Sequence, residues 1–577
     1  MSKTILIISW LCMLCATFFY YPKWKQTKTE ATISWDVSGY YIYLPAIFIF
    51  HDVRKLEWKK AIDSTYYPST SAYQSFTHPG GNQVFKYTCG VSVLYMPFFF
   101  LAHALAPVVG ATADGYSWIY QFMISVSALF YSLIGLIFLR KILLRYVDDK
   151  IVAMGLGIIV FATNYFDYGS ITGAMSHSYL FCGYSILLYL IDNYYRTKRN
   201  QWFYISCGLI GLMTLIRPTE LISTILLFAW NAESIAEIRE RILNWMRQPS
   251  FVLIAIGLFF IFPLLQLIYW KYTAGEWIVY SYQEQGFSWL RGHHIWQGLM
   301  SYQAGWWMYS PAMVIIIPSL IYSVVKKERH FLAFTSFIIL SLYLTFAWDE
   351  WTYGGSLGQR ALVQHYPVML FPIVYWVNSI LNWKWKYVFY SFILFSVLYN
   401  FWMIHQAHRG GLFRGIMTNK AYFWHTLFTF KKDPDNEVLL DTNEFPITFD
   451  DQKSKPVLDT LYADSISCIG HDKTFILFDG KIPAGKLKLH ALGKCSQREW
   501  DVWSMNQLII QYLSGDRPVK SVMVRINRFL DKENEARPFD LITQSPNKSF
   551  NRLKIYLWNP GYTASGITQL KLSVSNE

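Results

Sequence analysis

The sequence predicts an all-α membrane domain with about eleven transmembrane helices, followed by a β-sandwich-like domain outside the membrane. Three observations lead to this fold class. The 577-residue chain is 53% hydrophobic and only 15% charged, which is too apolar for an ordinary soluble protein. Apolar runs long enough to cross a bilayer core of about 30 Å recur through residues 1–405. Beyond that point the chain becomes polar, and short alternating runs replace the long apolar ones.

The basic residues predict how the chain is oriented in the membrane. The net charge is +13, but Lys and Arg collect in short loops between apolar runs, as the positive-inside rule describes for cytoplasmic loops. Membrane insertion therefore explains the charge, and we expect no nucleic acid as a partner. The arginines of residues 231–248 follow a helical pattern, which predicts an amphipathic helix on the membrane surface. The basic clusters lie at residues 140–150, 196–199, 239–247, 326–329 and 384–386.

Placing all these clusters in the cytoplasm predicts the spans. If the apolar run 91–110 crossed the membrane, the basic cluster at 140–150 would lie outside the cytoplasm. We therefore expect this run to lie half in the outer interface, with Pro97 disturbing its helix. The N-terminus is then inside, and residues 22–118 form a first outer loop that follows the first span. The expected spans are 4–21, 119–139, 151–167, 176–194, 203–217, 219–231, 250–270, 309–325, 331–348, 364–381 and 386–404.

The C-terminal part predicts antiparallel strands. The runs TFILF, KLKLHAL, SVMVRI, RLKIYLW and QLKLSVS alternate in polarity, and turn sequences such as DGKIPAG and NPGYTASG separate them. The predicted organisation is a transmembrane catalytic domain over 1–405, a linker over 406–434 and an outer β-rich domain over 435–577. Nothing in the outer domain indicates catalysis, and such domains often bind or pack.

The first candidate for chemistry is Asp36, in the stretch TISWDVSGYYIYLPAIFIF of the first outer loop. A carboxylate at the outer edge of a membrane cavity can act as a general base on an acceptor hydroxyl, or help to hold a divalent metal. The alternative is a solvated acid at a helix end. The aromatic context and the long loop that follows favour a substrate cleft.

Three further candidates lie at the same predicted face. Lys86 precedes the interfacial run and could bind a lipid phosphate, although a lone Lys there is most often an interface anchor. His177 begins a span and could contact substrate, although a lone His is more often a packing residue. Arg217 precedes Pro218 at a turn between spans, where it could bind phosphate or form a structural pair with Glu220.

Two late outer loops complete the candidate site. In the loop 271–308, Gln285 stands among aromatic residues that suit stacking on sugar rings, although an ordinary aromatic belt would look the same. In WDEWTYGGSLGQR, Asp349 and Glu350 precede a Gly-rich turn and then Arg360. Glycines permit close backbone approach to a ligand, and Arg360 could bind a phosphate or pyrophosphate oxygen.

Together these features resemble the membrane-embedded GT-C glycosyltransferases that use polyprenyl-phosphate sugars, such as protein O-mannosyltransferases and the aminoarabinose transferase of lipid A. The resemblance covers roughly residues 1–405. It rests on Asp36 in the first outer loop, Lys86 in FKYTCGVSVLYMPFF, the RPT turn at Arg217, and a late loop of the form W-x-x-W-x-x-G-x-S-x-G-x-R that ends in Arg360. The order of these motifs and their shared side carry the likeness, since none is diagnostic alone.

The resemblance implies a GT-C-like fold and an inverting single displacement at the sugar C1. Asp36 would activate the acceptor, Lys86 would hold the lipid phosphate, and Arg217 and Arg360 would be candidates for the same task. The implied partners are a polyprenyl-phosphate sugar donor, a glycan, lipid or protein acceptor, and membrane lipid. Several members carry two acids in the first loop, whereas Asp36 stands alone in WDVS and the next acid is Asp52. A paired-carboxylate metal site is therefore in doubt, and a divalent cation stays an open expectation.

Two other classes of membrane protein fit part of the pattern. A transporter or flippase for lipid-linked glycans would place ionisable groups near the bilayer midplane and show repeat symmetry, neither of which the sequence indicates. A glycan polymerase or ligase would also work at the outer face, and only Asp36 and the Arg360 loop argue against it. We expect a multi-pass protein of a bacterial inner membrane, with its active face and C-terminal domain in the periplasm, although a eukaryotic internal membrane would also fit.

Overall fold

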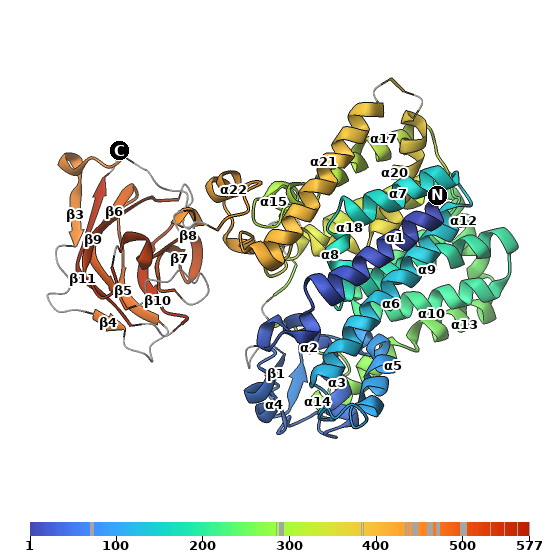
Figure 1. Ribbon diagram of the computed structural model, residues 1–577, viewed down its shortest axis with the longest axis horizontal. Coiled ribbons are helices and arrows are strands. Elements are labelled where there is room, and N and C mark those ends of the chain that lie inside the picture. Colours follow the sequence, from blue (N-terminus) through green and yellow to red (C-terminus); the bar gives the residue numbers. More distant parts are fainter. Residues whose placement is uncertain are drawn as a thin grey trace. The chain divides into compact units, whose positions relative to one another are not determined.

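A computed structural model describes most of the chain as two compact units, residues 1–416 and 417–577 (Figure 1). The first unit is almost entirely helical, and the second consists mainly of β-strands. The described residues are 1–69, 74–283, 285–287, 293–381, 383–384, 386–432, 436, 438–440, 448–458, 466–468, 474–496, 505–530, 532–546, 549–561, 564–575. Of the residues weighed in the late outer loop 271–308, Glu284 and Arg291 lie outside this set.

Each apolar run that was expected to span the membrane forms helix in the first unit. The expected span 250–270 is two helices, because Pro263 cannot donate the backbone hydrogen bond that a continuous helix needs. The elements at the expected spans are α1 (Ser2–Cys15), η1 (Ala16–Tyr20), α6 (Trp118–Leu143), α7 (Asp149–Phe161), α9 (Ser176–Thr197), α10 (Asn200–Ile216), η4 (Pro218–Ser223), α11 (Thr224–Ala229), α13 (Pro249–Phe260), α14 (Pro263–Ala274), η6 (Pro311–Ile315), α17 (Ile316–Val325), α18 (Phe331–Ala347), α20 (Tyr366–Ile380) and α21 (Lys386–His405).

The expected count of eleven spans is not reached. Within the described part, three helices are long and apolar enough to cross a bilayer alone, namely Ser2–Lys25, Trp118–Leu143 and Lys386–Gly410. A fourth is reached if α12 (Ile235–Met246) and α13, which meet at a bend of 97°, count as one span. The physical reason is length, since several other apolar helices have 10–17 residues whereas a straight crossing needs about 20.

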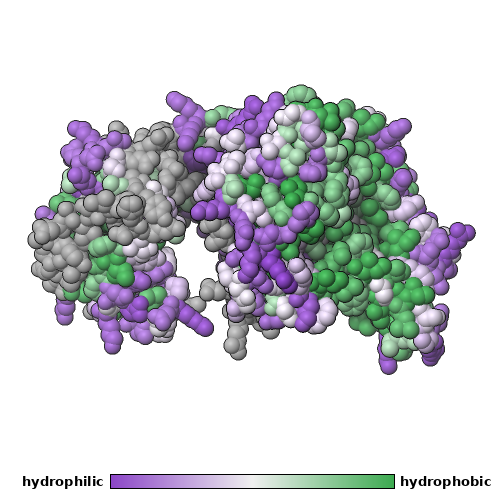
Figure 2. All heavy atoms as spheres, turned by 90° about the horizontal axis from the view of Figure 1, so that it is seen from below, coloured by the Kyte–Doolittle hydropathy of each residue, from purple (hydrophilic) through white to green (hydrophobic). Residues whose placement is uncertain are grey.

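Hydrophobic residues also cover part of the outside of this unit. Figure 2 shows a broad hydrophobic surface on the helical unit. Large apolar side chains are exposed along α13, α14 and α21, among them Leu253, Ile268, Leu394 and Leu398. Soluble proteins rarely expose contiguous apolar surface on this scale, so the surface indicates contact with lipid.

The first outer loop is folded rather than open. Its described part contains three short α-helices, the 3-10 helices η2 (Lys23–Lys25) and η3 (Lys28–Glu30), and a two-stranded hairpin. The apolar run 91–110 forms a helix that keeps Pro97 inside it. The remaining short helices of the unit lie between the long ones. These elements are α2 (Trp35–Tyr41), α3 (Tyr43–Phe48), α4 (Lys59–Tyr66), β1 (Ser75–Thr77), β2 (Gln83–Phe85), α5 (Gly90–Leu105), α8 (Tyr165–Gly169), α15 (Ile295–Met300), α16 (Trp306–Tyr309), α19 (Arg360–Val363) and η7 (Gln406–Gly410).

The second unit begins with the short helix α22 (Lys420–Thr426) and continues as two antiparallel sheets. One sheet has the order β5-β10-β7-β8, and the other has the order β3-β11-β6-β9 with β4 also paired to β11. Leucine, isoleucine and valine side chains from both sheets share one core, which is the arrangement expected of a sandwich. The strands are β3 (Lys455–Leu458), β4 (Ile466–Cys468), β5 (Thr474–Gly480), β6 (Lys486–Cys495), β7 (Gln507–Ser514), β8 (Arg517–Arg525), β9 (Arg537–Gln544), β10 (Arg552–Trp558) and β11 (Ser565–Ser575).

Candidate functional site

Asp36 lies in the first turn of the short helix α2. Its side chain is buried, with 5% of the residue exposed. The helix starts at Trp35, whose φ of 46° is in the left-handed region that a bulky residue rarely adopts. The Trp35 carbonyl accepts a hydrogen bond from Gln74 Nε2 at 2.9 Å, and its N–H donates to Pro68 O at 2.9 Å. The strained start of the helix is therefore held in place by the rest of the loop, and it directs Asp36 inward.

Both carboxylate oxygens of Asp36 are engaged by other parts of the first unit. Arg360 Nη2 donates to Oδ2 at 2.6 Å, across 324 residues of sequence. Tyr87 donates its hydroxyl hydrogen to Oδ1 at 2.7 Å. A charge-assisted hydrogen bond of this length in a largely buried place is stronger than an exposed ion pair. The first outer loop and the late Arg360 loop, which the sequence singled out separately, thus meet at Asp36.

The contact between Tyr87 and Asp36 depends on Gly39. A Cβ at this position would lie 2.4 Å from Tyr87 Cδ2 and 2.4 Å from Gln74 Oε1. Real Cβ atoms do not approach other atoms so closely, so a side chain at residue 39 would displace the Tyr87 ring. The glycine after WDVS is thus required for the packing around Asp36.

We expect Gly39→Ala to lower the free energy of unfolding by about 1–3 kcal/mol, because the added methyl overpacks a buried contact. It should also weaken activity by moving Tyr87 away from Asp36. Gly157→Ala is the matched control, since α7 leaves nothing within 4 Å of a Cβ there. Thermal unfolding of the two purified variants checks the prediction, and equal stability of both would contradict it.

Arg360 is placed by the turn that precedes it. Gly358 has a φ of 67°, and Gln359 Nε2 donates to Ala304 O at 2.9 Å and to Trp351 O at 3.1 Å. The glycines of this turn were expected to admit a ligand. Instead, a Cβ on Gly355 would lie 3.3 Å from Ile416 N, so this glycine lets the turn approach its own chain.

Lys86 and Arg217 are brought close together by the contact between α5 and the end of α10. A Cβ on Gly90 would lie 2.5 Å from Ile216 N, and Thr88 Oγ1 donates to Ile216 O at 3.1 Å. The segment that carries Lys86 therefore packs directly against the corner that carries Arg217. In this corner α10 stops before Pro218, because proline disfavours helical backbone in the residue that precedes it.

Arg217 differs from Arg360 in having no carboxylate partner. Its guanidinium lies over the Tyr353 ring, 5.9 Å from the ring centroid. Among the residues that the structure describes, no acid forms an ion pair with it. The structural pair with Glu220 that the sequence allowed is not formed, because Glu220 pairs with His365 instead. Arg217 is thus a half-buried cation that is available to an anionic ligand.

Phenol groups surround these charges. Burial raises the pKa of the Tyr40 phenol, Asp36 adds to the rise, and Arg217 and Arg360 oppose it. Burial likewise raises the pKa of the Tyr353 phenol to about 12, and the same two arginines oppose that rise. Both arginines therefore act on both tyrosines, and Asp36 acts with them on Tyr40, which indicates that the three charges lie near one another.

Lys86 belongs to the same cluster. Burial lowers the pKa of its ammonium group, while the negative charges of Asp36 and Glu350 oppose the change. The ammonium nitrogen lies 5.6 Å from the centroid of the Tyr87 ring and 5.7 Å from that of Tyr282. A half-buried lysine close to both an acid and two aromatic rings is well placed to bind an anion beside Asp36.

His177 lies behind the cluster, fully buried. Its Nδ1 is 3.0 Å from Gln364 Oε1, and Gln364 Nε2 donates to Glu220 Oε1 at 2.5 Å. A carboxylate only accepts hydrogen bonds, so Glu220 fixes the orientation of the Gln364 amide, and His177 must donate through Nδ1. Tyr184 donates to the other Glu220 oxygen at 2.6 Å. His177 is thus held through Nδ1 by this network, while its Nε2 has no hydrogen-bond partner among the described residues, and its contact with substrate stays a prediction.

The other predicted residues lie at the rim. Gln285 uses its backbone, donating to Tyr282 O at 3.2 Å and accepting from the Tyr280 hydroxyl at 2.5 Å. Asp349 is exposed and accepts from Gly286 N at 2.9 Å. Glu350 is exposed and bonds within its own turn, to Thr352 and Gly354. The structure thus gathers Asp36, Lys86, Arg217 and Arg360. None of these hydrogen bonds of Gln285, Asp349 and Glu350 involves those four residues, although the charge of Glu350 acts on Lys86.

The side chains of the cluster do not form a divalent-cation site. Arg360 pairs with Asp36 directly, and Lys86 and Arg217 add two further positive charges nearby. In the described ranges, no group of three or more His, Cys, Asp or Glu side chains is arranged to hold a metal. We derive no step through a metal ion.

Sequence reasoning missed several residues of this region. Tyr87 was not identified, although it follows Lys86 directly, and neither were Gln364 and His365, which follow Arg360 within two turns. A further buried pair joins Asp167 to His408, with Nε2 2.7 Å from Oδ1. No spacing signal could have joined Asp167 to His408, because they lie on separate helices and meet only in the folded chain.

Comparison with known proteins adds little. No protein-family model matches the chain, and no curated protein matches it. Among solved structures, the oligosaccharyltransferase of Archaeoglobus fulgidus in its apo form is 10% identical over 78% of this chain and 61% of that chain, with a TM-score of 0.40. The enzymatically active domain of tailspike protein 4 of bacteriophage CBA120 is 11% identical over 21% and 19%, with a TM-score of 0.14. The chain thus spans less than two thirds of either protein, and at these TM-scores neither likeness carries an argument.

Proposed function

We propose that the protein is a membrane glycosyltransferase of the GT-C type, which moves a sugar from a polyprenyl-phosphate donor to a lipid, glycan or protein acceptor. The observation that carries the proposal is the cluster of one acid, Asp36, with three cations, one of which has no acidic partner. A phosphate diester has the charge that Arg217 and Lys86 would bind, and an acceptor hydroxyl or amine needs the base that Asp36 would supply.

The proposed reaction is a single displacement. The acceptor attacks the sugar C1, and its proton passes to a carboxylate oxygen of Asp36. The bond between C1 and the phosphate oxygen breaks, and the polyprenyl phosphate leaves with the bonding electron pair. Arg217 and Lys86 stabilise the phosphate charge that develops. Arg360 holds the Asp36 carboxylate in place, and its partly exposed guanidinium is a further candidate for contact with the phosphate.

The cellular setting is part of the same proposal. We propose that the N-terminus is in the cytoplasm, and that Asp36 and the C-terminal unit are at the periplasmic face of a bacterial inner membrane. The basic loops support this orientation. The helices of 10–17 residues would lie in the bundle as parts of broken segments, where neighbouring helices satisfy their ends.

Proteoliposomes distinguish a transferase from a transporter. The purified protein is incubated with a synthetic polyprenyl-phosphate sugar and a membrane extract that supplies acceptors. We expect free polyprenyl phosphate to appear and the transferred sugar to have the inverted anomeric configuration. A transporter would move the donor across the bilayer without cleaving it, and that result would overturn the proposal.

The pH dependence of kcat/KM for the donor should show the titration of the Lys86 ammonium group. Burial lowers the pKa of its ammonium group below the usual 10.5, so raising the pH removes the positive charge earlier than for an exposed lysine. The neutral amine binds phosphate poorly, and we expect kcat/KM for the donor to fall on the alkaline side. Lys86→Arg should abolish this alkaline decline, since arginine stays charged. An unchanged decline in Lys86→Arg would show that another group titrates.

A further inference from the structure

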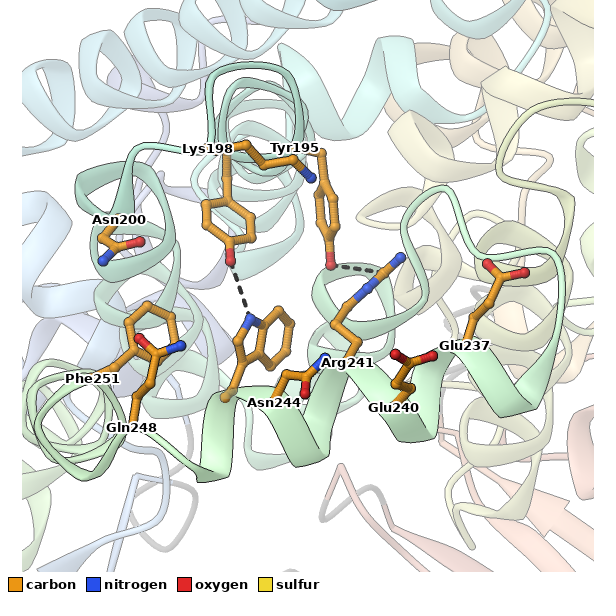
Figure 3. Close-up of a pocket in the computed structure, with 11 residues that line it drawn as sticks. Tyr195, Lys198, Asn200, Glu237, Glu240, Arg241, Asn244, Gln248 and Phe251 are labelled. Atoms are coloured by element: carbon orange, nitrogen blue, oxygen red, sulfur yellow. Dashed lines mark hydrogen bonds between the residues drawn. The ribbon is translucent and has the colours of Figure 1, made fainter.

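A second site lies at the other end of α9 from the candidate active site. A pocket of about 400 Å³ opens between the last turn of α9, the start of α10 and the helix α12 (Figure 3). His177 is near the first residue of α9, and Tyr195 is near its last. At about 1.5 Å of rise per residue, these positions lie about 27 Å apart along the helix. The pocket therefore belongs to a different site, which is at the cytoplasmic face in the orientation proposed above.

Aromatic side chains form the floor of this pocket and are fixed by hydrogen bonds. Trp245 Nε1 donates to the Tyr194 hydroxyl at 3.1 Å. Arg241 Nη1 donates to the Tyr195 hydroxyl at 2.8 Å and to the carbonyl oxygens of Phe228 and Trp230 at 2.7 and 2.8 Å. These contacts attach α12 to the ends of α9 and α11, as Figure 3 shows for the two aromatic contacts. The floor is thus preformed before any ligand binds.

Charged groups of both signs line the same pocket. Lys198 ends α9 with a φ of 56°, and its ammonium nitrogen lies 5.2 Å from the centroid of the Tyr195 ring. Glu240 is on the facing side, on α12. Within the described ranges, neither Lys198 nor Glu240 forms an ion pair or a side-chain hydrogen bond. A second acid of the lining, Glu237, accepts hydrogen bonds from Glu233 N and Ser234 Oγ at the start of α12. Lys198 and Glu240 are thus the cation and the anion of the pocket without such partners, beside the arginine of its floor.

The position of α12 places the pocket at the depth of lipid headgroups. Ile235 and Met246 are 77% and 64% exposed on a face of α12 that does not line the pocket. The helix meets the apolar helix α13 at a bend of 97°. An amphipathic helix that turns sharply into an apolar one lies along the bilayer surface, with its apolar side in the acyl region. The polar side of α12, and the pocket with it, then lies among the headgroups.

We propose that this pocket binds a phospholipid with a zwitterionic phosphoethanolamine headgroup. The headgroup phosphate would pair with Lys198 and with the free edge of Arg241, and its ammonium group would donate to Glu240 and to the Asn244 side-chain oxygen. Charge complementarity supports this assignment, because a zwitterion can pair with both Lys198 and Glu240, whereas a ligand with a single charge can pair with only one of them. The site is independent of the proposed transfer reaction.

Lipid retention by the full-length protein tests this site. The protein is purified, reconstituted in nanodiscs of equal phosphatidylethanolamine and phosphatidylglycerol, and then examined by native mass spectrometry for lipids that stay bound. We expect phosphatidylethanolamine to be retained about tenfold more than phosphatidylglycerol in the wild type. Glu240→Gln should lose this preference, and Lys198→Ala should lose retention of both lipids. Both residues are exposed, so the fold should survive, which a thermal unfolding curve checks.

Arg239→Gln is the control, because Arg239 is on α12 but does not line the pocket, and it should bind lipid as the wild type does. Equal retention of both lipids by the wild type, or unchanged retention in Lys198→Ala and Glu240→Gln, would overturn the proposal. Free O-phosphoethanolamine provides the second arm. If O-phosphoethanolamine displaces the bound lipid only weakly, the ligand is a membrane lipid. If it binds as tightly as the lipid does, the ligand is a soluble phosphate ester, and the proposal of a membrane lipid is wrong.

Discussion

Asp36→Asn is expected to reduce kcat for sugar transfer by about 10²–10⁴-fold while the protein still inserts into the membrane. The amide has the size of the carboxylate and still accepts a hydrogen bond from Tyr87, but it cannot take a proton from the acceptor. The variant also leaves Arg360 without its ion-pair partner, so some loss of stability should accompany the loss of rate. Initial rates at saturating donor, normalised to the amount of folded protein, measure the effect.

Two variants separate the catalytic role of Asp36 from its structural one. Arg360→Gln removes the same ion pair but keeps the carboxylate, so we expect a higher KM for the donor and a much smaller loss of kcat. Glu57→Gln removes an exposed carboxylate from the same outer loop and should leave kcat unchanged. If Asp36→Asn and Arg360→Gln lose kcat equally, Asp36 is only the partner of Arg360, and its proposed role as base is wrong.

Arg217→Gln is expected to lower kcat/KM for the donor by about 10–100-fold, the value of one charge-assisted hydrogen bond to phosphate. Its thermal stability should stay close to that of the wild type, because no carboxylate in the described part of the chain forms an ion pair with Arg217 and Glu220 keeps its contact with His365. Arg217→Lys should recover part of the loss by keeping the charge. A large fall in stability with unchanged kcat/KM would show that Arg217 only supports the fold.

The sequence singled out three cations that the structure brings near Asp36, because each lies next to a signal that can be read locally; their roles in substrate binding stay a prediction. Arg217 precedes a proline, Arg360 ends a glycine-rich turn, and Lys86 precedes an apolar helix. What could not be read is which cation Asp36 binds. That choice depends on a contact across 324 residues, and the ion pair with Arg360 leaves Arg217 as the cation without an acidic partner.

For the membrane domain, the sequence predicted the positions of the helices but not the number of membrane crossings. Apolar runs predicted where helices form, but their length did not predict which helices cross a bilayer. Pro263 divides one expected span, and other apolar helices end after 10–17 residues. Hydrophobic composition alone cannot separate a short crossing helix from a buried one, since both exclude water. The exposure of Asp349 and Glu350 could not be predicted either, because a loop sequence does not say which side chains turn outward.

The most direct test of the account is the lipid-carrier pool of membranes that contain the wild type, Asp36→Asn or Glu57→Gln as their only copy. Lipid extracts are analysed by mass spectrometry for polyprenyl-phosphate sugars. The account predicts that such a donor accumulates with Asp36→Asn and is consumed with the wild type and Glu57→Gln. If all three pools are the same while each protein is inserted and folded, Asp36 does not serve the transfer of a lipid-linked sugar, and the proposed function is contradicted.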